Sequence, residues 1–198
     1  IEKGADELIK VNDLSPMAEA FRILITNMNF MLPKKKGKVV FVTSTVKGEG
    51  KTFVSVNLAL TLASPSKKTI IIGSDIRNPQ LQRYNTARKG LIGLTEYLND
   101  ENVKLEEIVH PSSFNKNLDV IYSGSIPPNP TDLLSNGKYE VLIETLKEKY
   151  DYIILDTAPL MLVTDSFLIS EVADITLYVT RSKYTEKSLI DFANKVMD

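Results

Sequence analysis

The apolar positions of the chain form two patterns that alternate along most of its length. One pattern is a short continuous run of β-branched and other apolar residues, which is typical of strands buried on both faces of a parallel sheet. The first run begins at Val39 and leads into a glycine-bearing segment, and the others predict strands at 69–72, 118–122, 152–155 and 175–179. These runs are the candidate strands of one sheet.

The second pattern repeats apolar residues at three- and four-residue steps and predicts helices. The first helix should have Ser15 as its N-cap and Pro16 at its first position, and end near Leu32. Its apolar face consists of Met17, Phe21, Leu24, Met28 and Met31, while Glu19, Arg22 and Thr26 share another face that is free for a partner. Further helices are expected over 53–63, 95–99, 105–109, 139–149, 165–172 and 185–196.

Strands that alternate with helices predict a single α/β domain, with a doubly wound, mainly parallel sheet flanked by helices. The 198 residues suffice for one sizeable core, and 43% hydrophobic and 25% charged residues are ordinary for a globular domain. We expect residues 1–38 to form an N-terminal segment and residues 39–198 to form a core that binds its ligand at the carboxyl ends of the strands.

Composition narrows the function classes. A formal net charge of −1 gives no electrostatic reason to expect nucleic acid as a partner. Because the chain has no cysteine, it forms no disulfide and no thiolate metal site. No apolar run reaches the roughly 18 residues of a membrane span, and no signal-peptide pattern opens the sequence, so we expect nothing in the chain to cross a membrane by itself.

The segment after the first strand predicts a phosphate-binding loop. Gly48 and Gly50 allow backbone N–H groups to curl around an anion. Lys51 can reach the β- and γ-phosphates, and the Thr52 hydroxyl can ligate Mg²⁺ at a helix N-terminus. The strict pattern has glycine six residues before the lysine, where this chain has Thr45. An ordinary strand-to-helix turn is the alternative, but the flanking strand and helix are the context that a nucleoside triphosphate site requires.

Two other candidate strands are followed by acidic residues. Asp156 ends the run at 152–155 and would hold Mg²⁺ beside Thr52, with a turn-capping role as the alternative. Asp75 and Arg77 follow the run at 69–72 and are candidates for contact with the triphosphate or its acceptor, or for an ion pair that fixes the loop. Because parallel strands end at the same edge of a sheet, both acids should lie near the phosphate-binding loop.

Four motifs together resemble one family. KGEGKT at 47–52, IIIGSDIRNP at 70–79, DYIILDTAP at 151–159 and GSIPPNPTDLL at 124–134 are similar, in order and spacing, to the bacterial tyrosine kinases of polysaccharide export. The similarity covers nearly the whole chain. Those kinases use Walker motifs on a fold related to septum-site and chromosome-partition ATPases, and the proline-rich segment favours the kinase branch over these ATPases.

The resemblance implies ATP as substrate, Mg²⁺ as cofactor, and a role for each motif residue. Lys51, Asp75 and Asp156 would be catalytic, with Asp75 as the base for the tyrosine phenol, and Thr52 would join the two aspartates around the metal. Arg181, after the last strand, would approach the nucleotide base, or else form a surface ion pair. The nucleotide would contact Lys47, Gly48, Glu49, Gly50, Lys51, Thr52, Phe53 and Arg181.

The chain departs from the family pattern at three places. Gly73 stands where the family has the first acid of an Asp-x-Asp motif, so that Asp75 is left alone. Lys47 replaces a frequent proline, which should leave the phosphate cradle intact. Glu19 and Arg22 match the family's Glu-x-x-Arg-x-x-Arg oligomerisation helix, but Ile25 replaces the second arginine, which predicts a weakened or differently built ring.

The family also implies partners and a location. A ring of identical subunits would phosphorylate the tyrosine-rich tail of each neighbour, and the ring would control polysaccharide export through its assembly and disassembly. A membrane-spanning activator, in the same or another chain, and a cognate tyrosine phosphatase would complete the system at the cytoplasmic side of the bacterial inner membrane. We expect this chain to be a fragment of a longer membrane protein. The alternative is a partition-type ATPase or nucleotide-binding switch that transfers no phosphate to protein.

Overall fold

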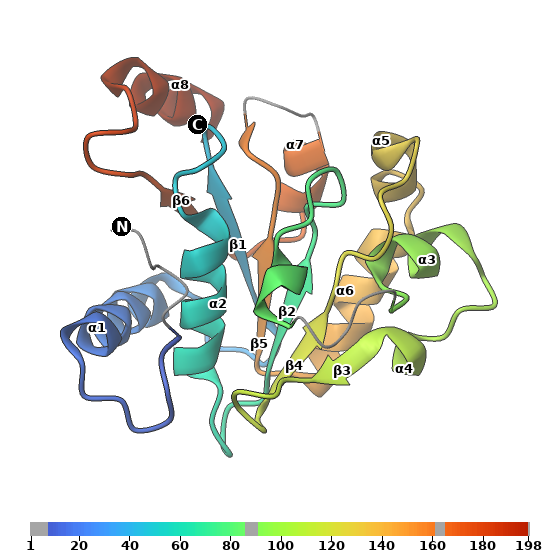
Figure 1. The fold of residues 1–198 in the computed structure, drawn as a ribbon, viewed down its shortest axis with the longest axis horizontal. Helices are drawn as coiled ribbons and strands as arrows, with labels where there is room; N and C mark the ends of the chain where they lie inside the picture. The colour runs from blue at the N-terminus through green and yellow to red at the C-terminus, as the bar shows by residue number, and fades with distance from the viewer. Residues whose placement is uncertain (1–7, 86–90, 161–164, 198) are drawn as a thin grey trace.

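The computed structural model describes residues 8–85, 91–160 and 165–197 (Figure 1). Within these ranges a six-stranded sheet has the strand order β3-β4-β2-β5-β1-β6. Its parallel strands are β1 (Lys38–Ser44), β2 (Thr69–Gly73), β4 (Leu118–Ile121), β5 (Tyr152–Asp156) and β6 (Ile175–Val179). The edge strand β3 (Val109–Pro111) pairs with β4 in the antiparallel direction. The doubly wound, mainly parallel sheet that the alternating pattern predicts is therefore confirmed.

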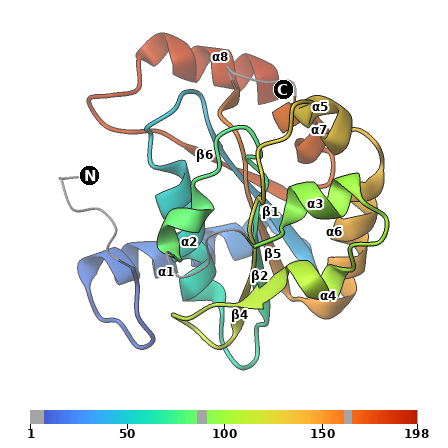
Figure 2. The ribbon, with the colours of Figure 1, turned by 45° about the vertical axis from the view of Figure 1, so that its right-hand side comes forward.

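Helices cover both faces of this sheet (Figures 1 and 2). The helices are α1 (Pro16–Met31), α2 (Lys51–Leu62), α3 (Leu94–Asn99), α4 (Leu105–Ile108), α5 (Pro130–Leu134), α6 (Lys138–Lys149), α7 (Asp165–Ser170) and α8 (Lys187–Met197), with a 3₁₀ turn η1 (Leu81–Tyr84) after β2. Within the described ranges, every helix is too short or too polar to cross a bilayer.

Two hydrophobic clusters pack on opposite sides of the strands. One joins α1 and α2 to side chains such as Val40, Ile71 and Ile154, and the other joins α3, α4 and α6 to side chains such as Phe41 and Ile153. Successive strand residues point to opposite faces, so strands buried on both sides need the continuous apolar runs that the sequence has. Because the sheet is held from both faces, the loops at the carboxyl ends of its strands have a fixed base.

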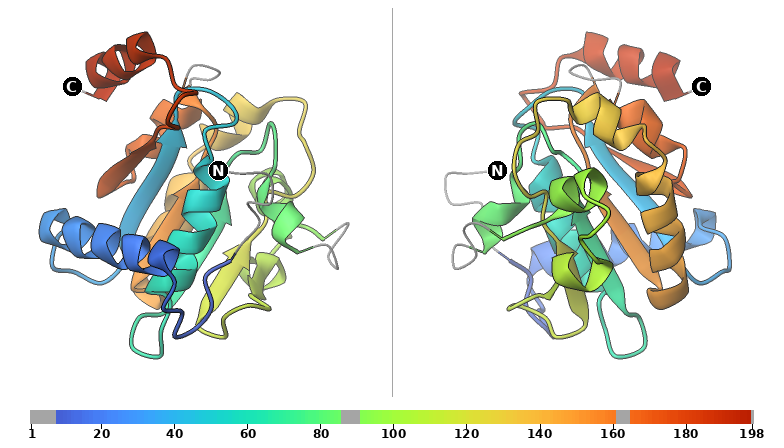
Figure 3. Two further views of the ribbon diagram at one scale, coloured as in Figure 1. Left: turned by 60° about the vertical axis from the view of Figure 1, so that its left-hand side comes forward. Right: turned by 90° about the vertical axis from the view of Figure 1, so that its right-hand side faces the viewer.

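The carboxyl ends of the parallel strands meet along one edge of the sheet, at the top in Figure 1. The loop that joins β1 to α2 lies at this edge, and the turn between β6 and α8 lies beside it (Figure 3). In the sheet register Asp156 is level with Val42 on β1 and with Gly73 on β2. The phosphate loop and the ends of β2 and β5 are therefore brought together by strand pairing alone.

Several local predictions were incomplete. Residues 109–111 form β3, because they pair with β4 at a sheet edge, although the helical spacing predicts residue 109 as the end of a helix. The proline-rich segment contains the short helix α5, which begins at Pro130. The last helix begins at Lys187 rather than at Thr185.

The apolar face of α1 is narrower than predicted. Phe21 and Met28 are buried, and Met17 and Leu24 are partly buried against the core that α1 shares with α2. Met31, which the spacing placed on the same face, is 74% exposed at the last position of the helix. The helix therefore turns part of its apolar surface outward.

Candidate active site

The loop between β1 and α2 has the backbone of an anion-binding loop. Gly48 and Gly50 have φ angles of 91° and 92°, which lie in the left-handed region that side chains disfavour. Helix α2 begins immediately afterwards, so its first N–H groups and its positive dipole end face the loop. Lys51 and Thr52 are the first two residues of this helix and are both buried. The loop thus has the backbone conformation that the prediction requires, while phosphate binding by its residues stays a prediction. We refer to residues 45–52 as the P-loop.

Lys51 lies between the two predicted carboxylates. Its Nζ atom is 3.5 Å from Oδ1 of Asp156 and 3.9 Å from Oδ2 of Asp75. The exposed fractions are 8% for Lys51, 5% for Asp75 and 1% for Asp156, so all three groups are almost removed from solvent. Charges buried to this extent persist only with partners, which each of these groups has. The three catalytic candidates therefore form one ionic cluster.

Backbone contacts hold the ends of β2 and β5 together beneath this cluster. The Ser74 and Asp75 N–H groups both donate to the Asp156 carbonyl oxygen, over 2.8 and 3.1 Å. On the other side, Oγ of Ser55 in α2 lies 3.1 Å from Oδ1 of Asp156. Ser55 was not predicted as a site residue, because its position becomes relevant only when α2 packs against β5.

The Asp75 carboxyl has an altered proton affinity. Burial raises the pKa of Asp75 above its ordinary value of 3.8, and the nearby Lys51 ammonium group counters this rise only in part. The Asn78 N–H donates to Oδ1 of Asp75 over 3.0 Å and also favours the charged form. A carboxyl with a raised pKa accepts a proton more readily, which suits a general base.

The side chains present fit a nucleotide phosphate with a magnesium ion. One ammonium group and two carboxylates leave the cluster with one excess negative charge, which favours a cation in the site. Carboxylate and hydroxyl oxygens are the protein ligands that Mg²⁺ takes, and Asp75, Asp156 and Thr52 supply them at one strand edge. Oγ1 of Thr45 is buried at the start of the P-loop without a hydrogen-bond partner. The loop thus has polar capacity that its own contacts do not use.

Gly73, which stands where the family has its first acid, is in contact with Ser123, just after the neighbouring strand β4. The Ser123 hydroxyl donates to the Gly73 carbonyl oxygen over 2.7 Å. A Cβ atom on Gly73 would lie 2.6 Å from Oγ of Ser123 and 3.1 Å from its backbone nitrogen. Ser123 therefore occupies the space that a side chain at position 73 would need.

Among the described residues, no three histidine or acidic side chains form a cluster that would hold a metal ion.

The remaining predicted nucleotide contacts lie in different surroundings. Lys47 and Gly48 are exposed, whereas Glu49 is buried and its carboxylate accepts from the Val46 N–H over 3.0 Å. Phe53 is partly buried at the third position of α2. The Arg181 guanidinium donates to the Gly48 carbonyl oxygen over 3.1 Å, so this residue reaches the P-loop backbone.

Two residues of the C-terminal turn were missed by sequence reasoning. The Tyr184 hydroxyl donates to the Lys47 carbonyl oxygen over 2.8 Å, and the Thr185 hydroxyl donates to the Glu49 carboxylate. The helical spacing places Thr185 in the helix predicted over 185–196. No local signal identifies either contact, because the partners are more than 130 positions away in the chain.

The predicted oligomerisation residues lie on α1, away from the P-loop. Glu19 and Arg22 form an ion pair of 2.9 Å, and the Arg22 guanidinium also donates to the Asp13 carbonyl oxygen over 2.8 Å. Ile25, which stands in place of the family's second arginine, is partly buried against the core below α1. Exposed apolar side chains on the same helix are Ile23, Phe30 and Met31.

The proline-rich segment reaches the loop after β2. The Arg77 guanidinium donates to the Thr131 hydroxyl in α5 over 2.9 Å. This hydrogen bond joins the loop after β2 to α5, and the predicted roles of Arg77 stay predictions.

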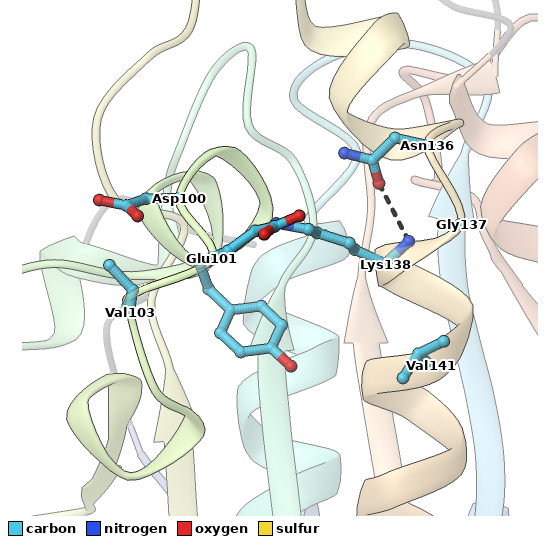
Figure 4. A pocket seen from close by; sticks show the side chains of 8 residues that line it. Asp100, Glu101, Val103, Asn136, Gly137, Lys138 and Val141 are labelled. Carbon is cyan, nitrogen blue, oxygen red and sulfur yellow. Dashed lines mark hydrogen bonds between the residues drawn. The ribbon is translucent and has the colours of Figure 1, made fainter.

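A separate open hollow of about 540 Å³ lies between α3 and the start of α6 (Figure 4). It is lined by residues of α3, of the connection to α4 and of the start of α6, among them Tyr97, Asp100, Glu101 and Lys138. No P-loop residue lines it. The hollow is therefore distinct from the ionic cluster.

Comparisons with known proteins find similar sequences and similar folds. A family model described as an AAA domain matches residues 37–197. The tyrosine-protein kinase CpsD of Streptococcus agalactiae serotype III (strain NEM316) is 35% identical over 189 residues, which are 96% of this chain and 80% of that protein. The kinase domain of Escherichia coli tyrosine kinase ETK superposes with a TM-score of 0.82 at 28% identity, over 91% of this chain and 69% of that chain.

The fold is shared more widely. The septum site-determining protein MinD of Pyrococcus horikoshii OT3, in complex with Mg-ADP, superposes with a TM-score of 0.66 over 81% of this chain and 64% of that chain. At 23% identity this likeness concerns the fold alone.

The raised pKa of Asp75 leads to a prediction about pH. A carboxyl whose pKa is higher in the folded state binds more protons when folded, so its ionisation destabilises the fold above that pKa. We expect Asp75→Asn to raise the thermal unfolding midpoint of the ligand-free protein at pH 7, and to raise it progressively less as the pH falls and the Asp75 carboxyl of the folded parent takes up its proton.

The matched control is Asp100→Asn. Asp100 is exposed, and hydrogen bonds from Asn102 lower the pKa of its carboxyl, so neutralising it should not stabilise the protein at pH 7. A lower midpoint for Asp75→Asn at pH 7 would mean that the attraction to Lys51 outweighs the desolvation of Asp75.

The contact between Gly73 and Ser123 leads to a second prediction. Gly73→Asp alone should lower the free energy of unfolding by about 1–3 kcal/mol, because its Cβ meets Ser123. Ser123→Ala alone should cost about 1 kcal/mol for the lost hydrogen bond. The double variant should be more stable than the sum of these losses by at least roughly 0.5 kcal/mol, measured by urea denaturation. Strict additivity would show that Ser123 does not exclude a side chain at position 73.

Proposed function

Because the chain belongs to the AAA-domain family and, within it, to the bacterial tyrosine-protein kinases, we propose that it transfers the γ-phosphoryl group of ATP to protein tyrosines with the help of Mg²⁺. The observation that carries the proposal is the buried cluster of Lys51, Asp75 and Asp156 beside the left-handed glycines of the P-loop. An ATP-hydrolysing site needs a similar cluster, so the family relationship decides for a tyrosine acceptor.

Each residue has a defined role in this reaction. The P-loop N–H groups and Lys51 bind the phosphates and stabilise the charge that develops on them. Thr52, Asp75 and Asp156 would hold Mg²⁺, which would supply positive charge beside the phosphates. Positioning and charge neutralisation supply most of the acceleration in phosphoryl transfer, because its transition state is loose.

Asp75 is the base in this proposal. A tyrosine phenol has an ordinary pKa of about 10 and must lose its proton to attack phosphorus. The raised pKa of Asp75 and its position beside Lys51, the residue that would face the phosphates, both support this role. Because Gly73 supplies no second acid and Ser123 fills the space beside it, Asp75 acts alone on the β2 side.

The wider setting follows from the family and is part of the proposal. Subunits of a ring phosphorylate the tyrosine tails of their neighbours, and the ring regulates the synthesis and export of capsular or exopolysaccharide. A membrane-spanning activator domain holds the kinase at the cytoplasmic side of the inner membrane, and a tyrosine phosphatase reverses the modification. Helix α1 supports the ring contact, because it presents Glu19, Arg22, Ile23 and Phe30 on an outward surface.

The test of the kinase activity is phosphotyrosine formation. The protein is incubated with Mg²⁺-ATP and a tyrosine-rich peptide, and phosphotyrosine is followed by mass spectrometry. Lys51→Met should lower the rate by at least about 100-fold, because it removes the charge that faces the developing phosphate. Lys104→Met, an exposed lysine outside the cluster, should retain the parent rate.

Lys51-dependent binding of ATP without any phosphotyrosine would refute the kinase proposal. This result would favour a nucleotide-binding switch, the alternative function that the lack of an acid at position 73 supports.

The ring contact is tested by measuring mass. The parent should form assemblies whose mass, measured by light scattering, rises with protein concentration. Phe30→Ser or Arg22→Ala should lower the association constant of the assembly at least about tenfold. Phe30 is exposed, so Phe30→Ser should change the unfolding midpoint little, whereas Arg22→Ala also removes the contacts with Glu19 and Asp13 and should lower the midpoint slightly. Assembly that is equal in parent and variants would exclude this face of α1 from the contact.

A further inference from the structure

The turn that follows β6 is bonded to the P-loop at successive residues. We call residues 181–185 the strap. The Tyr184 hydroxyl donates to the Lys47 carbonyl oxygen over 2.8 Å, and Nη1 of Arg181 donates to the Gly48 carbonyl oxygen over 3.1 Å. Both contacts run from a side-chain donor of the strap to a main-chain acceptor of the loop.

A third contact engages a buried carboxylate. Glu49 is 2% exposed, and its Oε1 accepts from the Thr185 hydroxyl while its Oε2 accepts from the Val46 N–H. Oγ1 of Thr185 in turn accepts from the Arg181 N–H over 2.8 Å. A buried carboxylate is costly unless it accepts hydrogen bonds, so these donors determine where the Glu49 side chain lies. The Glu49 carboxylate therefore links the loop to the strap through hydrogen bonds and, being an anion, does not bind phosphate.

The two carbonyl contacts also fix the direction of the loop's N–H groups. In a trans peptide the C=O of one residue and the N–H of the next point in opposite directions. When the Lys47 and Gly48 carbonyl oxygens face the strap, the N–H groups of Gly48 and Glu49 face away from it. An anion-binding loop needs free N–H groups that converge on one point, and the strap orients two of them.

The backbone and packing of the strap are constrained as well. Lys183 has a φ angle of 61°, which is uncommon for a residue with a side chain and is found where surrounding contacts impose it. The strap also lies against Gly48, since a Cβ atom there would be 2.8 Å from the Tyr184 hydroxyl oxygen. The close approach and the three bonds together require this conformation of the turn.

We propose that the strap is a positioning element that holds the P-loop in the conformation that binds phosphate, with Tyr184 and Thr185 as positioning residues. This proposal deepens the proposed function and rests on it, because it assumes that nucleotide phosphates bind this loop. The strap hydroxyls do not touch the reacting atoms. They lower the conformational freedom that the loop would otherwise lose when it binds the nucleotide.

The experiment compares variants that lose the hydroxyl of Tyr184 or Thr185 with control variants that keep both strap hydroxyls. Tyr184→Phe retains the ring over which the Arg181 guanidinium lies, and Thr185→Val retains the shape of the side chain. The matched controls are Tyr97→Phe, whose hydroxyl lies outside the site, and Thr185→Ser, which keeps the hydroxyl. Dissociation constants for Mg²⁺-ATP and Mg²⁺-ADP are measured by calorimetry, and KM for ATP and kcat by phosphotyrosine formation.

We expect Tyr184→Phe and Thr185→Val each to weaken binding of both nucleotides roughly three- to tenfold, the size of one lost hydrogen bond. KM for ATP should rise by a similar factor, while kcat stays within about twofold, because bound phosphates order the loop once the site is saturated. Thr185→Ser and Tyr97→Phe should match the parent. A merely structural defect would instead lower kcat through the loss of folded protein and leave the dissociation constants unchanged.

The two proposals fail in different ways. Parent-like dissociation constants in both Tyr184→Phe and Thr185→Val would overturn the positioning role of the strap and leave the kinase proposal intact. Nucleotide binding without phosphotyrosine in the parent would overturn the kinase proposal, while the dissociation constants would still test the strap.

Discussion

The burial of one lysine between two carboxylates is the interaction on which the candidate site depends. Lys51 comes from the start of α2, Asp75 from the end of β2 and Asp156 from the end of β5, so three elements must be in register before the charges can meet. Parallel pairing sets this register, because it places Asp156 level with Gly73 on the neighbouring strand. The apolar clusters on both faces of the sheet hold these strands in place.

Around this cluster the chain uses hydrogen bonds to fix backbone that has no regular structure. Main-chain donors at Ser74 and Asp75 fasten the end of β2 to that of β5, and the strap fastens the P-loop to the end of β6. Polar groups removed from water must find partners, so each loop at this edge takes its shape from a neighbour. Nucleotide binding and phosphoryl transfer would therefore both depend on this set of hydrogen bonds.

Two departures from the family pattern have a physical explanation in the fold. Position 73 has no acidic side chain, and the Ser123 hydroxyl lies where such a side chain would begin. This hydroxyl also donates to the Gly73 carbonyl oxygen. The isoleucine at position 25 packs against the core of its own chain instead of offering a charge to a neighbour. In both places a polar group of the family's site is replaced by a contact within the subunit.

The sequence by itself determined the fold class, the P-loop with its two glycines, and the strand-end positions of Asp75 and Asp156. These features depend on local patterns: apolar runs, helical spacing, and turn residues that follow a strand. Only the tertiary structure decided that Ser55 supports Asp156, that Ser123 excludes a side chain at Gly73, and that Thr185 belongs to the strap and not to α8. Each of these contacts joins residues 50 or more positions apart, and such pairs leave no periodic signal in a single sequence because only strand order and helix packing bring them together.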